Sequence, residues 1–151
     1  MSTATPHDPG CIFCRIAGGE VPAYRVHEDG QVVAFLDVGP VSRGHVLVVP
    51  RAHYARLEQM PEELAAACMA VAARVARALG PALGAGEAWA YNVLQNNGAE
   101  AGQLVQHVHF HLIPKPADDP GRGLQIGWPA GELDEADAEK LAAGIRQALG
   151  G

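Results

Sequence analysis

The sequence lacks an excess of positive charge, an apolar run of transmembrane length and a charged-then-apolar leader. Its 151 residues carry 17 acidic and 11 basic side chains, which gives a formal net charge of −6 at pH 7. This balance argues against nucleic acid or an anionic membrane as the main partner. We therefore expect a cytoplasmic protein without a nucleic-acid or membrane partner.

Cysteine is also scarce, with three residues in the whole chain. Cys68 lies in an Ala-rich helical pattern and is expected to be a small core residue. Cys11 and Cys14 form a C-x-x-C pair. A thioredoxin-like redox motif needs a preceding strand, and only ten largely polar residues precede Cys11. Zinc is the better interpretation if the fold supplies two further ligands.

Several common phosphate and acyl motifs are missing. There is no Walker loop, no G-x-G-x-x-G after a strand and no G-x-S-x-G elbow. The usual phosphate-binding and acyl-transfer motifs are therefore excluded, and no organic cofactor is expected.

The most informative stretch present is 106–114, with the sequence QHVHFHLIP. In a strand, successive side chains point to opposite faces. His107, His109 and His111 would then share one face, while the three apolar residues between them enter the core. Clustered imidazoles indicate metal binding or catalysis at neutral pH. The alternative is a set of surface histidines on a solvent-exposed edge strand.

Hydrophobic periodicity predicts the remaining elements. A helix is expected over 62–79, opened by Pro61 and closed by Gly80 and Pro81. Asp29 and Gly30 mark a hairpin between two strands. Short helices are expected over 11–18 and, capped by Asp134, over 134–149; strands are expected over 24–28, 31–36, 45–49, 88–95 and 107–113.

These elements predict an α+β sheet with one long crossover helix and its helices on one side. Residues 1–10 are read as a disordered tail and 11–151 as a single domain, with a C-terminal extension from about residue 115. The terminal helix, with Leu141 and Ile145 on one face, is expected to pack on the sheet or on a second subunit.

The loop 96–103, NNGAEAGQ, precedes the histidine strand. Its glycines would let backbone amides approach a ligand, and its Asn and Gln side chains add neutral donors. Beside a row of imidazoles such donors favour a phosphate site, although a plain connecting turn is the alternative. A neutral imidazole can attack phosphorus and so divide one difficult displacement into two easier ones.

Taken together, these motifs resemble the histidine-triad (HIT) family over roughly residues 11–114. The row itself resembles the signature His-φ-His-φ-His-φ-φ. The other matching stretches follow in the family's order: CIFCRI (11–16), AFLD (34–37), GHVLVVP (44–50) with His53, and GQ (102–103). The resemblance implies a five-stranded antiparallel sheet, dimerised into a ten-stranded one.

The resemblance also implies roles for individual residues. His109 would be the nucleophile that takes a nucleotidyl group from a nucleoside phosphate ester, anhydride or phosphoramidate. His111 and Asn96 would contact the α-phosphate, with Gln103 close by. Asp37 would accept hydrogen bonds from the ribose hydroxyls.

A base clamp and a C-terminal contact are implied in the same way. The clamp residues, which simple core packing would explain equally well, are Phe13, Ile16, Val21, Phe35 and Val38. Trp128 resembles a Trp-Pro pair that reaches the active site of the other subunit. Covering a local apolar patch is the alternative for this side chain.

In the branch of the family with a C-x-x-C pair, the resemblance implies a structural zinc bound by Cys11, Cys14, His53 and His107. The alternative is a pair of free thiols with His107 as a brace. His45 is expected to be a brace or core residue.

One position departs from the family pattern. Leu104 stands where many members carry Ser or Thr, and it has no hydroxyl for a leaving group. The expected function is a HIT-type nucleoside phosphoramidase or dinucleoside polyphosphate hydrolase. A non-catalytic nucleotide-binding module and a zinc-containing interaction protein are the alternatives.

Overall fold

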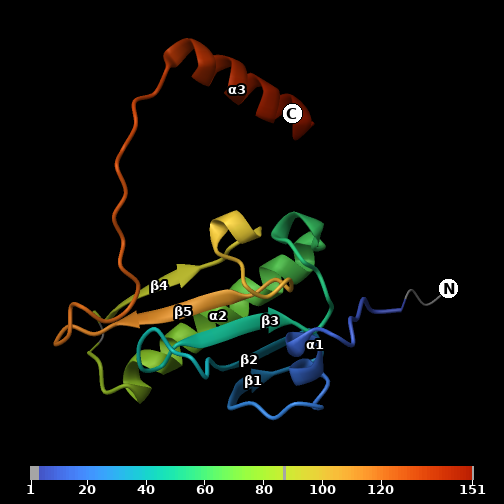
Figure 1. Ribbon diagram of the computed structural model, residues 1–151, viewed down its shortest axis with the longest axis vertical. Coiled ribbons are helices and arrows are strands. Elements are labelled where there is room, and N and C mark those ends of the chain that lie inside the picture. Colours follow the sequence, from blue (N-terminus) through green and yellow to red (C-terminus); the bar gives the residue numbers. More distant parts are fainter. Residues whose placement is uncertain (1–3, 87, 151) are drawn as a thin grey trace.

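The computed structural model describes residues 4–86 and 88–150. It contains a five-stranded antiparallel sheet in the order β1-β2-β3-β5-β4. The strands are β1 (Arg25–Glu28), β2 (Val32–Leu36), β3 (Val46–Pro50), β4 (Ala90–Leu94) and β5 (Phe110–Lys115). The α+β class, the strand count and the antiparallel pairing predicted from the sequence are confirmed (Figure 1).

Helix α2 (Glu62–Ala82) connects β3 to β4 and covers one face of the sheet. Its buried side chains pack on inward-facing residues of β2, β3 and β5. Gly80 and Pro81, predicted to end this helix, form its last turn instead. By length and composition alone α2 could cross a membrane, contrary to the sequence reading. Its buried face identifies it as the core helix of this domain.

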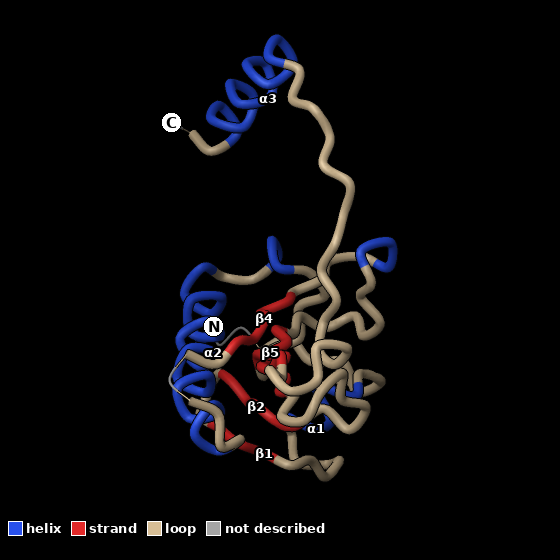
Figure 2. Tube along the Cα trace, turned by 90° about the vertical axis from the view of Figure 1, so that its left-hand side faces the viewer, coloured by secondary structure: helices blue, strands red, loops and turns tan. Residues whose placement is uncertain are grey.

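Helix α1 (Ile12–Ala17) lies on the opposite face of the sheet from α2 (Figure 2). The prediction that the helices share one side is therefore wrong. In β2 the side chains alternate between the two clusters: Val32 and Ala34 face α2, while Val33 and Phe35 face α1. Since both faces of the central strands are covered, this part of the sheet is apolar on both sides.

Part of the predicted disordered tail makes backbone hydrogen bonds to the domain, and the disorder of residues 1–10 stays a prediction. Residues 1–3 of the expected tail lie outside the described residues. Within 4–10, the Pro6 carbonyl accepts a hydrogen bond from the backbone N–H of His53 at 2.8 Å, and the Asp8 carbonyl accepts from Cys11 at 3.0 Å. The first bond joins the segment to the loop after β3, and the second joins it to the N-cap residue of α1.

The C-terminal extension leaves the domain after β5. A segment without helix or strand leads to α3 (Glu135–Ala148), whose N-terminus is capped by the Asp134 side chain as predicted. Both views show α3 apart from the sheet (Figures 1 and 2). All described residues of α3 are at least partly exposed. Packing of α3 on its own sheet is therefore wrong, and packing on a second copy remains a prediction.

Candidate active site and metal centre

The histidine row begins before the strand rather than inside it. β5 starts at Phe110, where it pairs with Val48 of β3. The predicted strand 107–113 thus began three residues too early and ended two residues too early. The alternation nevertheless holds, because Val108, Phe110 and Leu112 enter the core beneath α2. The three imidazoles lie on the other side of this segment, toward α1.

The middle histidine has one ring nitrogen fixed by the backbone. Nδ1 of His109 lies 2.7 Å from the carbonyl oxygen of His107. A carbonyl only accepts, so Nδ1 carries the proton and Nε2 keeps its lone pair. The ring of His109 is 6 % exposed, and burial lowers its pKa. The imidazole of His109 is therefore neutral and held in one orientation. Its Nε2 is suited to nucleophilic attack.

The third histidine lies beside the second. The ring centroids of His109 and His111 are 4.8 Å apart. Burial, assisted by the neighbouring His109 and His45, lowers the pKa of His111 to about 4. Nδ1 of His111 is 2.9 Å from Nε2 of the buried His45, which acts as the predicted brace.

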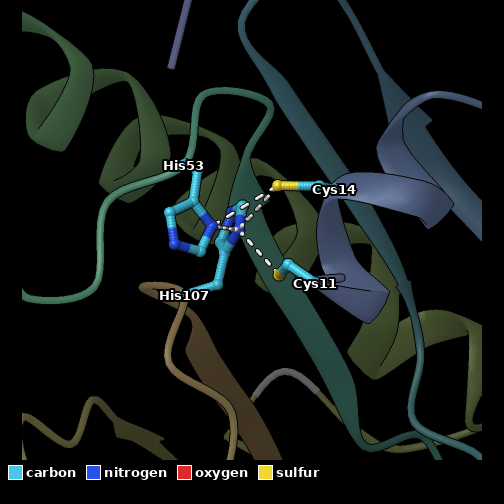
Figure 3. A group of neighbouring side chains, drawn as sticks. All are labelled: Cys11, Cys14, His53 and His107. Atoms are coloured by element: carbon cyan, nitrogen blue, oxygen red, sulfur yellow. Dashed lines mark hydrogen bonds between the residues drawn. The ribbon is translucent and has the colours of Figure 1, made fainter. Parts of the chain in front are cut away.

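The first histidine faces a cluster of potential metal ligands. Nδ1 of His107 lies 3.4 Å from Sγ of Cys11, 3.6 Å from Sγ of Cys14 and 3.2 Å from Nδ1 of His53. Sγ of Cys14 and Nδ1 of His53 are 3.4 Å apart. Figure 3 shows the four side chains converging from α1, from the loop after β3 and from the segment before β5.

These separations fit a tetrahedral Cys2His2 zinc site. With Zn–S near 2.3 Å and Zn–N near 2.0–2.1 Å, a tetrahedron places sulfur and nitrogen ~3.5 Å apart and two nitrogens ~3.3 Å apart. Nε2 of His107 lies 2.8 Å from the Pro50 carbonyl and must donate to it, which leaves the lone pair of Nδ1 for a metal. All four residues predicted as ligands are brought together.

The loop before the row differs from the prediction of an open amide cradle. The backbone N–H groups of Gly98, Ala101, Gly102 and Gln103 all form hydrogen bonds inside the loop. Gln103 is buried, and its amide accepts from Gly98 at 2.8 Å and donates to the Ala55 carbonyl at 2.7 Å. Its side chain thus holds the loop in place.

Asn96 keeps a donor available. Its amide makes one long contact, 3.4 Å, to the Gly102 carbonyl. Leu104, which directly follows this loop in the sequence, is 92 % exposed. The side chains of Asn96 and His111 therefore remain as donors for a phosphate group.

The predicted clamp residues divide into two groups. Phe13, Ile16 and Phe35 are buried in the cluster under α1, and Val21 packs at its edge. The Phe13 ring lies edge-on to His109 with 5.1 Å between centroids, so this apolar wall borders the nucleophile. Val38, in contrast, is 87 % exposed and takes no part in that cluster.

Asp37 lies beside the histidine row, whereas Trp128 lies on the C-terminal extension. Asp37 follows β2, and its Oδ1 accepts from the backbone N–H of Gly39 at 2.8 Å. Its Oδ2 is 3.6 Å from Nε2 of His45, which places a carboxylate beside the histidine row. Trp128 is exposed on the extension that leads to α3.

The sequence predicted a brace or core role for His45 but did not identify the residue that it contacts. Its signal was a histidine between Gly44 and an apolar strand, which does not reveal a partner 66 residues away. The structure supplies that partner, His111.

Comparison with known proteins agrees with this geometry. The family model described as "HIT domain" matches residues 18–118. The chain belongs to the HIT family. It is 43 % identical to adenosine 5'-monophosphoramidase HNT1 of Saccharomyces cerevisiae over 141 residues. The aligned region covers 93 % of this chain and 84 % of that protein.

Two solved HIT-family structures are similar as well. The histidine triad nucleotide-binding protein of Candida albicans superposes with a TM-score of 0.82 and 39 % identity, covering 93 % of this chain and 98 % of that one. A zinc-bound histidine triad family protein of Mycobacterium smegmatis gives a TM-score of 0.68 and 34 % identity, with 92 % and 95 % covered.

Proposed function

We propose that this HIT protein is a nucleoside phosphoramidase that acts through a covalent nucleotidyl-histidine at His109. The observation that carries the proposal is the 2.7 Å contact between His109 Nδ1 and the His107 carbonyl, which leaves Nε2 free to attack. The similarity to a yeast adenosine 5'-monophosphoramidase supports an AMP-type substrate. Nucleotide esters and dinucleoside polyphosphates present the same α-phosphate.

The reaction divides into two displacements. In the first, the Nε2 lone pair attacks the α-phosphorus while the P–N or P–O bond to the leaving group breaks and that group takes up a proton. In the second, water attacks the same phosphorus, loses a proton and releases the nucleotide and free His109. His111 and Asn96 donate hydrogen bonds to the phosphoryl oxygens as charge builds on them.

The surroundings of His109 fit the rest of a nucleotide. The apolar wall of Phe13 and Phe35 offers a surface for a purine ring. Asp37 offers a carboxylate oxygen to the ribose hydroxyls. The exposed Val38 stays outside this set and contributes at most at the rim of the site.

Cys11, Cys14, His53 and His107 would hold a structural zinc ion. Four protein ligands complete a tetrahedral shell, so this ion would brace the fold and leave no open position for substrate. Cysteines that bind zinc must be reduced, which supports the cytoplasmic location that we propose.

We further propose a homodimer built on β4. This strand is an edge of the sheet, and it exposes Tyr91 and Val93. An apolar edge strand is a site for pairing with another strand. A second copy would also give the exposed α3 and Trp128 a surface to pack on, whereas their own domain provides none in the residues that the structure describes.

The test is a steady-state assay of an adenosine phosphoramidate and a diadenosine polyphosphate, comparing wild type with His109→Ala. We expect the variant to lose at least about 10⁴-fold in turnover with the fold intact. The matched control is His27→Ala, because His27 is a β1 histidine paired with Asp29 outside the row. A His109→Ala protein with wild-type rates would reject the mechanism. AMP binding without turnover in the wild type would indicate a nucleotide-binding module.

A further inference from the structure

His45 is a buried histidine that the proposed chemistry does not use. It stands just before β3, is 3 % exposed and makes three polar contacts. The backbone N–H of Val41 lies 3.1 Å from its Nδ1. Its Nε2 lies 2.9 Å from Nδ1 of His111 and 3.6 Å from Oδ2 of Asp37.

These contacts determine which nitrogen of His45 carries the proton. A backbone N–H can only donate, so Nδ1 of His45 must be the acceptor for Val41. A neutral imidazole then has its single proton on Nε2. A protonated ring would place two donors against each other at Nδ1, and burial also lowers the pKa of His45. His45 is therefore the neutral Nε2–H form.

The proton of His45 determines the state of His111 in turn. The acceptor at hydrogen-bond distance from the Nε2–H of His45 is His111 Nδ1, at 2.9 Å, whereas Asp37 Oδ2 is 3.6 Å away. Nδ1 of His111 must accept this bond, so the single proton of neutral His111 resides on its Nε2. Asp37 keeps its Oδ2 for another donor.

We propose that His45 is a positioning residue that holds neutral His111 in the Nε2–H tautomer, as a hydrogen-bond donor to the α-phosphate. The proposal rests on the function assigned to His109. Two adjacent histidines of the row thus have opposite tautomers. His109 donates Nδ1–H to a carbonyl and exposes a lone pair, whereas His111 accepts at Nδ1 and offers a proton. The group that each Nδ1 contacts, not the imidazole ring itself, separates nucleophile from donor.

The consequence for catalysis is specific. Without the N–H of His45, the proton of His111 can move to Nδ1, and its Nε2 would then present a lone pair to a negatively charged phosphate. Such a ring repels the phosphoryl oxygens instead of stabilising them. Nucleotide affinity that depends on the base and ribose contacts would change little, while the chemical step would slow.

The direct test is ¹⁵N NMR of the imidazole nitrogens in the ligand-free wild-type protein, with His111 assigned through His111→Gln. We expect protonated Nε2 and bare Nδ1 at His111, and the reverse at His109. In His45→Leu, which has no donor, the His111 resonances should change to a mixture of tautomers. In His45→Gln, whose amide N–H takes the place of Nε2–H, they should keep the wild-type pattern.

Kinetics with the adenosine phosphoramidate supply the second reading. We expect kcat of His45→Leu to fall on the order of tenfold to a hundredfold with KM little changed, less than the 10²–10³ of a deleted donor. His45→Gln should recover most of this loss, which a merely structural role of the ring would not allow. His27→Gln is the control for replacing a histidine elsewhere.

Two results would overturn the proposal: a proton on Nδ1 of His111 in the wild type, or a folded His45→Leu with unchanged kcat. If His45→Leu does not fold, the wild-type spectrum and His45→Gln still decide. The spectrum needs no substrate, so a wild type without turnover contradicts the proposed function alone, while the tautomer of His111 is judged separately.

Discussion

The backbone carbonyl of His107 holds Nδ1 of His109 at 2.7 Å, while the ring of His107 faces Cys11, Cys14 and His53. One residue thus belongs to two sites through different atoms. Its main chain orients the proposed nucleophile, and its Nδ1 is a proposed zinc ligand. A metal bound at the His107 ring would therefore also help to fix the backbone carbonyl on which His109 depends.

Zinc removal should therefore affect both stability and turnover. We expect about one zinc per chain in protein purified without chelator. Cys14→Ser should lose the metal, lower the free energy of unfolding by about 2 kcal/mol or more and reduce kcat. Elemental analysis and urea denaturation measure these effects. Cys68→Ser is the control: this buried core cysteine lies outside the cluster, so zinc content should stay the same. A wild-type protein that contains no metal and is still fully stable would contradict the zinc site.

Leu104 should limit turnover of phosphoramidates. It is 92 % exposed and offers no hydroxyl to a leaving amine. We expect Leu104→Ser to raise kcat for an adenosine phosphoramidate by about tenfold, below the usual contribution of a positioned acid, without loss of stability. Leu133→Ser, on the exposed C-terminal extension, is the matched control. Equal rates in Leu104→Ser and wild type would show that this side chain does not limit leaving-group departure.

Stability should fall as the pH drops from about 6.5 to about 4. Unfolded histidine takes up its proton near pH 6.5, whereas burial holds the pKa of folded His111 to about 4. Between these values the unfolded state binds more protons, so acid favours unfolding. His111→Gln should reduce proton uptake on unfolding by up to about one proton in this window. Urea denaturation at several pH values measures the slope, and an unchanged slope in the variant would refute the assignment.

Gly80 of α2 should not tolerate alanine. A Cβ at this position would lie 2.5 Å from Nε1 of Trp89, whose ring also stacks on Tyr91 at 4.5 Å. Alanine favours a helix by up to about 1 kcal/mol over glycine, but displacing Trp89 should cost about 1–3 kcal/mol. We expect net destabilisation in thermal unfolding. Gly144→Ala in α3, with nothing within 4 Å of the added Cβ, should leave the domain's Tm unchanged or higher.

The proposed dimer should depend on one edge of the sheet. Val93 of β4 is 45 % exposed, and Val26 of β1, the opposite edge, is 50 % exposed. Val93→Lys should shift the mass measured by light scattering from dimer toward monomer, because a charge on a pairing edge is costly. Val26→Lys should remain dimeric. A monomeric wild type across micromolar concentrations would reject the dimer.

Local patterns were enough to predict the elements of this fold. The alternation of histidines with Val108, Phe110 and Leu112, and the 3.6-residue spacing of α2, follow from side-chain geometry within a single segment. Element boundaries were predicted less accurately, because they depend on residues outside the segment. Where β5 begins depends on its pairing with Val48, and Gly80, predicted to close α2, lies inside the helix against Trp89. Neither neighbour belongs to the segment itself.

The sequence by itself determined that three imidazoles share a face and that a C-x-x-C pair precedes the sheet, because those relations span a few residues. The resemblance to a family named the partners, but the tertiary structure decided their roles. It placed Cys11 beside His107, 96 residues away, joined the amide of Gln103 to the carbonyl of Ala55 and paired His45 with His111. A histidine's tautomer depends on what its ring nitrogens contact, and those contacts exist only once distant segments pack together.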